Sequence, residues 1–177
     1  MKNKFLLLEG IHSVAVEKIK KAGHEVDLLD KALPEKELIE KLKDYNAVGL
    51  RSKTQLTENL IKNSSHLDVI GAFCIGTNQI NLDTSKISGI PVFNAPYSNT
   101  RSVAELIISE SISLFRGISE KNIGAHKGVW KKSAKGSHEV RGKTMGIVGY
   151  GHIGSQTSIL AEAMGFNVIY YDIVKKL

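Results

Sequence analysis

The sequence has only one cysteine and no long hydrophobic run. That residue, Cys74, excludes an internal disulfide framework and a cysteine zinc site, and we expect it to be a buried structural side chain. No apolar run reaches the ~18 residues of a membrane span, and the run at residues 5–8 is too short for a signal peptide. These absences predict a cytoplasmic protein with no membrane partner.

Two further absences narrow the function. The histidines show no HxxxH or HExxH spacing that would place two ligands on one helical face, so no metal site is expected. The net charge is +6, but the lysines are spread along the chain, without a basic run interleaved with aromatic residues. No nucleic-acid partner is therefore expected, and a small anionic substrate explains the charge more simply.

The composition, with 42% hydrophobic and 24% charged residues, is typical of a globular protein. In the first half, short apolar runs alternate with amphipathic helical stretches, one of which has Thr57 as its expected cap. The runs are 5–8, 26–29, 47–50, 69–72 and 92–93, and the stretches include 13–22, 35–42 and 57–63. This alternation predicts an α/β fold in which residues 1–99 form a flavodoxin-like domain with a five-stranded parallel sheet.

A different pattern begins after residue 99. Apolar residues recur at helical spacing up to about residue 122 and predict one long helix that links two domains. The stripe consists of Ala104, Ile108, Ile112, Phe115 and Ile118. The next residues, 124–142, are rich in glycine and poor in aliphatic side chains, which predicts an irregular segment. We therefore expect residues 100–177 to contain the linking helix and a second, incomplete domain.

A glycine motif, GYGHIG at residues 149–154, lies between an apolar run and a helical stretch. Gly149 permits a turn that a Cβ would strain, Gly151 lets the backbone approach a pyrophosphate, and Gly154 lets the helix pack closely on the strand. At the start of this helix, the backbone N–H groups of His152 and Ile153 would meet the phosphates. The motif therefore predicts the strand, turn and helix of a dinucleotide site.

A second strand at residues 167–172 ends in Asp172, about 20 residues after the glycines, the usual separation in a dinucleotide site. A carboxylate there holds the ribose hydroxyls of NAD and repels the 2′-phosphate of NADP. We therefore expect NAD as the cofactor. The alternative for the glycine motif alone is a structural turn that binds nothing.

Four motifs occur in order along nearly the whole chain: RSKT at 51–54, GAFCIGTN at 71–78, FNAPYSNTRSVAE at 93–105 and VGYGHIG at 148–154. In sequence and spacing they resemble the D-isomer-specific 2-hydroxyacid dehydrogenases. The resemblance implies an NAD-dependent oxidoreductase with two domains. In such an enzyme a substrate domain clamps a small anionic 2-hydroxyacid against NAD, which is bound to a Rossmann domain, here residues 100–177.

The resemblance also implies which residues bind the substrate. Arg51, Ser52 and Lys53 would hold a carboxylate or phosphate from the loop after the third strand, although a charged run is also typical of a solvated loop. In similar enzymes an arginine can stand where Lys53 does, so this chain keeps the charge but loses the guanidinium fork. Ile75 and Gly76 would present backbone N–H groups to the substrate, with a simple tight turn as the alternative.

Three more features follow from the resemblance. Asn99 would reach the substrate from the hinge, or would only support the turn before the helix. Lys31 resembles a position that reaches the active site of a neighbouring subunit, and residues 126–130 resemble an element that crosses a dimer. A homo-oligomer is therefore expected of the full-length protein, although Trp130 could equally pack in the core.

Other parts implied by the resemblance are not expected in these 177 residues. The catalytic Arg, Glu and His of the family lie downstream of the Asp172 equivalent, so no catalytic residue is assigned and the chain alone is expected to be an inactive N-terminal fragment. Only two of about six Rossmann strands are present, which should leave apolar faces uncovered at Ile147, Val148, Val168 and Ile169. The alternative functions are a dehydrogenase for another D-2-hydroxyacid and a non-catalytic module that senses NAD.

Overall fold

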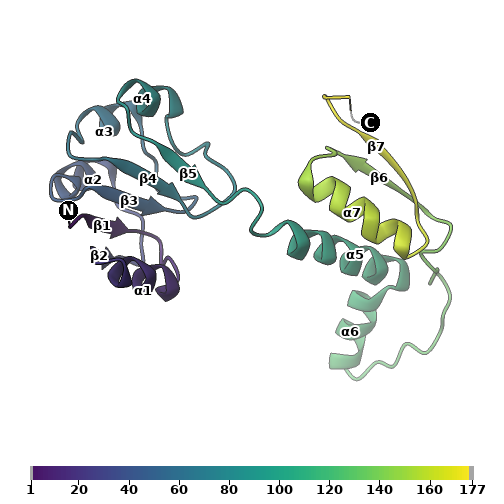
Figure 1. Ribbon diagram of the computed structural model, residues 1–177. Coiled ribbons are helices and arrows are strands. Elements are labelled where there is room, and N and C mark those ends of the chain that lie inside the picture. Colours follow the sequence, from purple (N-terminus) through teal and green to yellow (C-terminus); the bar gives the residue numbers. More distant parts are fainter. Residues whose placement is uncertain (1, 176–177) are drawn as a thin grey trace. The chain divides into compact units, whose positions relative to one another are not determined.

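The computed structural model describes residues 2–175 and consists of two compact units, Met1–Ser98 and Asn99–Leu177. Each unit has its own parallel sheet, with five strands in the first and two in the second (Figure 1). Within the described residues, no helix is both long and apolar enough to cross a membrane.

The sheet of the first unit has the strand order β2-β1-β3-β4-β5, with every neighbouring pair parallel. Its strands are β1 (Lys4–Leu7), β2 (Glu25–Leu28), β3 (Ala47–Leu50), β4 (Val69–Ala72) and β5 (Val92–Asn94). All five lie within about a residue of the apolar runs in the sequence. The strand order is that of the flavodoxin-like folds, so the α/β fold with a parallel sheet is confirmed.

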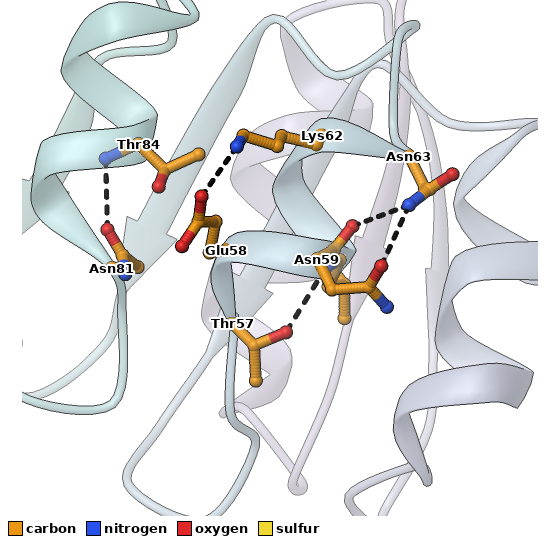
Figure 2. A network of polar contacts seen from close by, with 8 residues as sticks. Thr57, Glu58, Asn59, Lys62, Asn63, Asn81 and Thr84 are labelled. Carbon is orange, nitrogen blue, oxygen red and sulfur yellow. Dashed lines mark hydrogen bonds and ion pairs between the residues drawn. The ribbon is translucent and has the colours of Figure 1, made fainter.

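The helices of the first unit are α1 (Ser13–Lys21), α2 (Glu35–Leu42), α3 (Glu58–Lys62) and α4 (Leu82–Ile87). Thr57 caps α3 as predicted, because its hydroxyl accepts a hydrogen bond from the N–H of Leu60 at 3.2 Å. No pattern in the sequence predicted α4, which is only 6 residues long. Asn81 starts it by accepting a hydrogen bond from the N–H of Thr84 at 2.9 Å (Figure 2).

The core of the first unit lies between the sheet and α2 and α3. Leu38 and Leu42 from α2 and Leu60 from α3 are fully buried against strand residues. α3 also contacts α4, whereas α1 lies on the opposite face of the sheet (Figure 1). Because every strand is parallel, the connections place all the strand-to-helix loops at the carboxyl edge of the sheet.

The second unit begins with two helices, α5 (Thr100–Arg116) and α6 (Ile118–His126). The prediction of one long helix to about residue 122 is wrong, because Gly117 adopts the left-handed conformation, with φ 59°, and ends α5. α6 runs in another direction (Figure 1), which leaves Ile118 48% exposed, whereas Ala104 and Ile108 are buried. The irregular segment also begins later than predicted, after His126.

The rest of the second unit is β6 (Thr144–Val148), α7 (His152–Ala163) and β7 (Asn167–Tyr171), close to the predicted strand, helix and strand. α7 packs against α5 and the strands. Val148 and Ile169 are exposed, as expected of an uncovered face. Ile147 and Val168 are half-buried, so for them the prediction is wrong. Side chains alternate along a strand, and these two lie on the face that packs against the helices.

Candidate functional site

Side chains from four separate stretches meet at the carboxyl edge of the first sheet. Glu9 lies two residues beyond β1, Lys31 three residues beyond β2, and the loop of residues 51–54 directly follows β3. Residues 73–76 directly follow β4. Ligands of open α/β sheets bind at this edge, because the loops there can vary while the strands hold them in place. This edge is therefore the candidate substrate site.

A cavity of about 290 Å³ at this edge is lined by residues that include Glu9, Lys31, Arg51, Ser52 and Lys53. All except Glu9 are exposed. Across residues 2–175, the side chains of Lys31, Arg51 and Lys53 take part in no ion pair. Two carboxylates, Glu9 and Asp30, line the same cavity, so the three cations leave it with a net positive charge, which suits an anionic ligand.

Glu9 is a member of this site that the sequence analysis missed. Its carboxylate accepts hydrogen bonds from the backbone N–H groups of Arg51 at 3.2 Å, Lys53 at 2.9 Å and Thr54 at 2.8 Å. Glu9 is also the sole non-glycine residue in the described part of the chain with a positive φ, 63°. The available signal was a carboxylate directly after a buried apolar run and before Gly10, since such a residue needs partners.

The environment of Glu9 keeps its carboxylate ionised. Burial is the largest single influence and acts to raise the pKa of Glu9, but the hydrogen bonds from Thr54, Lys53 and Arg51 together outweigh burial and lower this pKa below its ordinary value of 4.5. A lowered pKa in the folded protein means that the charged form is the one that stabilises the fold. This contribution is complete above pH 4.5 and is lost as the pH falls through the lowered pKa.

We expect the thermal midpoint of the wild type to exceed that of the Glu9→Gln variant at pH 7, and the difference to shrink once the pH is below 4.5. Differential scanning calorimetry between pH 7 and about pH 3 measures this difference. An Asp30→Asn variant is the matched control, because Asp30 lines the same cavity. A difference for Glu9→Gln that is constant across this range would contradict the expectation.

Gln79 joins the loop after β3 to the loop after β4. It is 3% exposed, and its Nε2 donates hydrogen bonds to the carbonyl of Arg51 at 2.7 Å and to the carbonyl of Gly76 at 3.2 Å. The backbone of Arg51 is therefore held on both sides, at its N–H by Glu9 and at its carbonyl by Gln79. The side chain of Arg51 extends from a fixed position.

Ile75 and Gly76 lie outside the lining of the cationic cavity. The carbonyl of Ile75 accepts a hydrogen bond from Asn94 at 2.7 Å, and Gly76 lines a second cavity of about 780 Å³ between the loops after β3 and β4. A Cβ on Gly76 would lie 2.8 Å from Oδ1 of Asn78, a side-chain atom that can move away. Neighbouring Cys74 is half-buried rather than buried, and its thiol donates to the carbonyl of Gly76 at 3.2 Å.

Asn99 lies at the N-terminus of α5, in the second unit. Its side chain is exposed and makes no capping hydrogen bond, although its carbonyl accepts hydrogen bonds from the N–H of Val103 and the hydroxyl of Ser102, both at 3.0 Å. Support of the helix start thus comes from the backbone of Asn99. The amide of its side chain remains available to a ligand.

The glycine motif in the second unit forms a close turn between β6 and α7. Gly149 has φ 93°, and its N–H donates to the carbonyl of Tyr171 at 2.8 Å. A Cβ on Gly154 would lie 2.2 Å from the carbonyl oxygen of Gly149, far inside van der Waals contact. Gly149 is therefore required by the turn, and Gly154 by the approach of the helix to that turn.

Gly151 differs from both, because a Cβ at this position would meet no atom within 4 Å beyond its two chain neighbours. The protein itself does not need a glycine here, but a ligand that approaches the backbone would. Gly151 is also the N-cap of α7 and provides no side-chain hydrogen bond, and the first turn of α7 contains no acidic residue. The N-terminus of α7, with His152 and Ile153, is thus open toward a phosphate and carries positive potential.

Asp172 lies next to this turn, as the sequence predicted, and its carboxylate contacts the turn directly. Oδ2 accepts a hydrogen bond from the N–H of Tyr150 at 2.6 Å, and Oδ1 accepts one from the N–H of Val174 at 2.8 Å. The ring of Tyr150 stacks on Tyr170, with 3.9 Å between their centroids. The acidic residue and the glycine turn therefore form one connected structure.

A cavity of about 490 Å³ follows β6 and is lined by residues that include Met145, Ile147, Ile153 and Gly154. Its lining includes Ile153 but lacks Gly151, His152 and Asp172, so it adjoins the N-terminus of α7 without containing the whole of the turn. Within residues 2–175, no group of three or more His, Cys, Asp or Glu side chains is arranged to hold a metal ion.

Comparison with known proteins finds relatives along nearly the whole chain. The family described as "D-isomer specific 2-hydroxyacid dehydrogenase, catalytic domain" matches residues 5–169. D-3-phosphoglycerate dehydrogenase 1 of Saccharomyces cerevisiae is 55% identical over 171 residues, which are 97% of this chain and 36% of the yeast protein. The chain thus spans little more than a third of that relative.

Solved structures extend the comparison to three dimensions. A protein of Thermus thermophilus superposes with a TM-score of 0.89 over 98% of this chain and 57% of its own, at 24% identity, which establishes the fold alone. The 3-phosphoglycerate dehydrogenase of Entamoeba histolytica, solved with NAD⁺, superposes with a TM-score of 0.76 at 28% identity. That match covers 99% of this chain and 56% of the Entamoeba chain.

Proposed function

Because this chain belongs to the D-isomer-specific 2-hydroxyacid dehydrogenase family, we propose that it is part of an NAD-dependent D-3-phosphoglycerate dehydrogenase. The reaction is the oxidation of D-3-phosphoglycerate to 3-phosphohydroxypyruvate, the first step of serine biosynthesis. The observation that carries this proposal is the cationic cavity, in which Lys31, Arg51 and Lys53 can hold a substrate with both a phosphate and a carboxylate. The 55% identity to the yeast enzyme supports the same substrate.

We divide the work of the chain between its two units. In the first, Arg51, Ser52 and Lys53 bind and orient the anionic substrate, and Ile75 and Gly76 offer backbone N–H groups. In the second, Gly149, Gly151 and Gly154 shape the cradle for the pyrophosphate of NAD, and N–H groups at His152 and Ile153 bind its oxygens. Bound NAD supplies the acceptor for the hydride from C2 of the substrate. Asp172 selects NAD over NADP by repelling a 2′-phosphate.

The proton of the substrate hydroxyl needs a general base, and the developing charge needs a cation. We place these groups, an Arg, a Glu and a His, outside these 177 residues, in the part of the enzyme that corresponds to the remaining length of the relatives. On this proposal the chain alone binds the substrate but has no turnover. Asn99, at the start of α5, contributes its side-chain amide to substrate binding.

The proposal is tested by measuring NAD reduction with D-3-phosphoglycerate, D-lactate and D-glycerate, using the chain alone and a full-length protein that contains it. We expect turnover only in the full-length protein and with the highest kcat/KM for D-3-phosphoglycerate. A preference for an unphosphorylated D-2-hydroxyacid would replace the substrate but keep the enzyme class. Binding of NAD without turnover of any hydroxyacid by the full-length protein would instead indicate an NAD-sensing module.

We also propose that the enzyme is a homo-oligomer that buries the surface of the second unit around Trp130. Trp130 is 82% exposed and Leu114 is 80% exposed, so Trp130 does not pack in the core, contrary to the alternative considered for it. The two side chains line the same cavity, of about 650 Å³. Aromatic residues of this size on a surface are the usual centres of protein interfaces.

A Trp130→Ala variant is expected to raise the dissociation constant of the oligomer at least about thirtyfold, the usual effect of truncating a central interface tryptophan. Sedimentation velocity over a dilution series measures this constant. Ile87→Ala is the matched control, because Ile87 is 86% exposed but lies in the first unit. Equal dissociation constants for the wild type and Trp130→Ala would exclude this surface as the interface.

A further inference from the structure

Glu9 occupies an unexpected place for an acidic residue. It lines the same cavity as Lys31, Arg51 and Lys53, where its charge by itself would weaken the binding of an anion. Its backbone has φ 63°, a conformation that is unfavourable for residues other than glycine. Attraction of the ligand explains neither the negative charge at this position nor the unfavourable backbone conformation. A role in fixing the geometry of the site explains both.

The hydrogen bonds define that role. The carboxylate of Glu9 accepts from the N–H groups of Arg51, Lys53 and Thr54, three of the four residues of the loop. These bonds join the segment after β1 to a loop that lies more than 40 positions later in the chain, with sequence separations of 42, 44 and 45. With its N–H groups turned toward Glu9, the loop has the side chains of Arg51 and Lys53 exposed.

We propose that Glu9 is a positioning residue of the substrate site, which holds the backbone of residues 51–54 so that Arg51 and Lys53 converge on one anion. This proposal takes the identity of the substrate from the proposed function. The role of Glu9 in the structure of the loop does not depend on that function. Preorganised donors bind an anion more tightly than the same donors on a mobile loop, because less conformational entropy is lost on binding. Glu9 thus favours anion binding although it carries a negative charge.

This role predicts that loss of the negative charge of Glu9 weakens the binding of an anion, the opposite of the simple electrostatic effect. Removing a negative charge near an anion should strengthen anion binding, and Asp30→Asn, in the same cavity, is expected to leave the affinity equal or higher. Glu9→Gln removes the same charge but replaces one acceptor oxygen by an amide that cannot accept the loop N–H groups. We expect it to weaken binding roughly tenfold, as a consequence of a loosened loop.

The test uses the chain of residues 1–177 labelled with ¹⁵N and titrated with D-3-phosphoglycerate and, separately, with inorganic phosphate, while the amide signals of residues 51–54 are followed. Weaker binding of either probe by Glu9→Gln, together with unchanged or tighter binding by Asp30→Asn, supports the proposal. Binding by Glu9→Gln that equals or exceeds that of the wild type overturns it. If the wild type binds phosphate but not D-3-phosphoglycerate, the proposed substrate fails, whereas the role of Glu9 is still decided by phosphate.

Amide hydrogen exchange without any ligand provides an independent measurement. In Glu9→Gln the N–H groups of Lys53 and Thr54 should exchange at least about tenfold faster than in the wild type, whereas Val48 in β3 should be unchanged. Equal exchange rates at Lys53 and Thr54 would overturn the proposal. Should Glu9→Gln fail to fold, Glu9→Asp takes its place, because it keeps the charge but is one methylene too short to reach all three N–H groups.

Discussion

Replacing Arg51 with alanine is expected to weaken the binding of D-3-phosphoglycerate to this chain about a hundredfold. The cavity that Arg51 lines also contains Glu9 and Asp30, so the cations there must outweigh two carboxylates as well as bind the ligand. The guanidinium group of Arg51 has no ion-pair partner among residues 2–175, and its backbone is held at both the N–H and the carbonyl. Its donors are therefore available without rearrangement.

Titration calorimetry measures the loss. Arg51→Lys should be intermediate, about tenfold weaker than the wild type, because an ammonium keeps the charge but cannot bind an oxyanion through two parallel N–H groups. The matched control is Arg101→Ala, since Arg101 is also exposed but is paired with Glu105 at 2.6 Å in α5. An affinity of Arg51→Ala within a factor of about two of the wild type would remove the cavity from the substrate site.

The second large effect concerns Gly154. An alanine there places a Cβ 2.2 Å from the carbonyl oxygen of Gly149. Neither atom can rotate away, because the oxygen belongs to the backbone of the turn and the Cβ is fixed directly to the backbone of α7. The turn and the start of α7 must move apart, and we expect the second unit to lose about 3 kcal/mol of stability, the upper end of the usual overpacking cost. Thermal unfolding followed by the amide signals of β6 and β7 measures this loss.

Gly151→Ala separates folding from binding within the same motif. Because no atom beyond the two chain neighbours lies within 4 Å of the added Cβ and φ is −79°, the variant should keep the stability of the wild type within about 0.5 kcal/mol. The added methyl group would nevertheless occupy the path of a pyrophosphate, so the amide shifts that NAD induces at His152 and Ile153 should require at least about tenfold more NAD. Equal stability of Gly154→Ala and Gly151→Ala would refute the distinction between the two glycines.

The predictable parts of the fold are those that local pattern decides. The five strands and α2 of the first unit follow from apolar runs and helical periodicity, since each buries one face against its neighbours. α4 was not predicted, because a helix of 6 residues has too few turns to show a hydrophobic period. The end of α5 at Gly117 was not predicted, because the apolar stripe continues across this residue to Ile118. Hydrophobic periodicity does not indicate where a left-handed glycine ends a helix.

The residues of the candidate site also divide into those that local sequence predicts and those that it does not. The glycine motif and Asp172 are recognisable in sequence, because a tight turn and a helix N-terminus depend on residues that are neighbours in the chain. Glu9 and Gln79 were not recognisable, because the N–H groups and the carbonyl of the loop after β3 that they bind lie between 28 and 45 positions away. A backbone partner leaves no trace in the identity of the residue that provides it.

The sequence by itself determined the α/β class, the family and the residue types that suit an anionic substrate and NAD, because periodicity, glycine spacing and motif order are properties of the chain. Tertiary structure alone decided that Lys31 shares a cavity with Arg51 and Lys53, that Glu9 holds their loop, and that Gly151 faces open space whereas Gly154 is packed. These facts depend on distances between segments that are brought together only when parallel strands align their carboxyl ends.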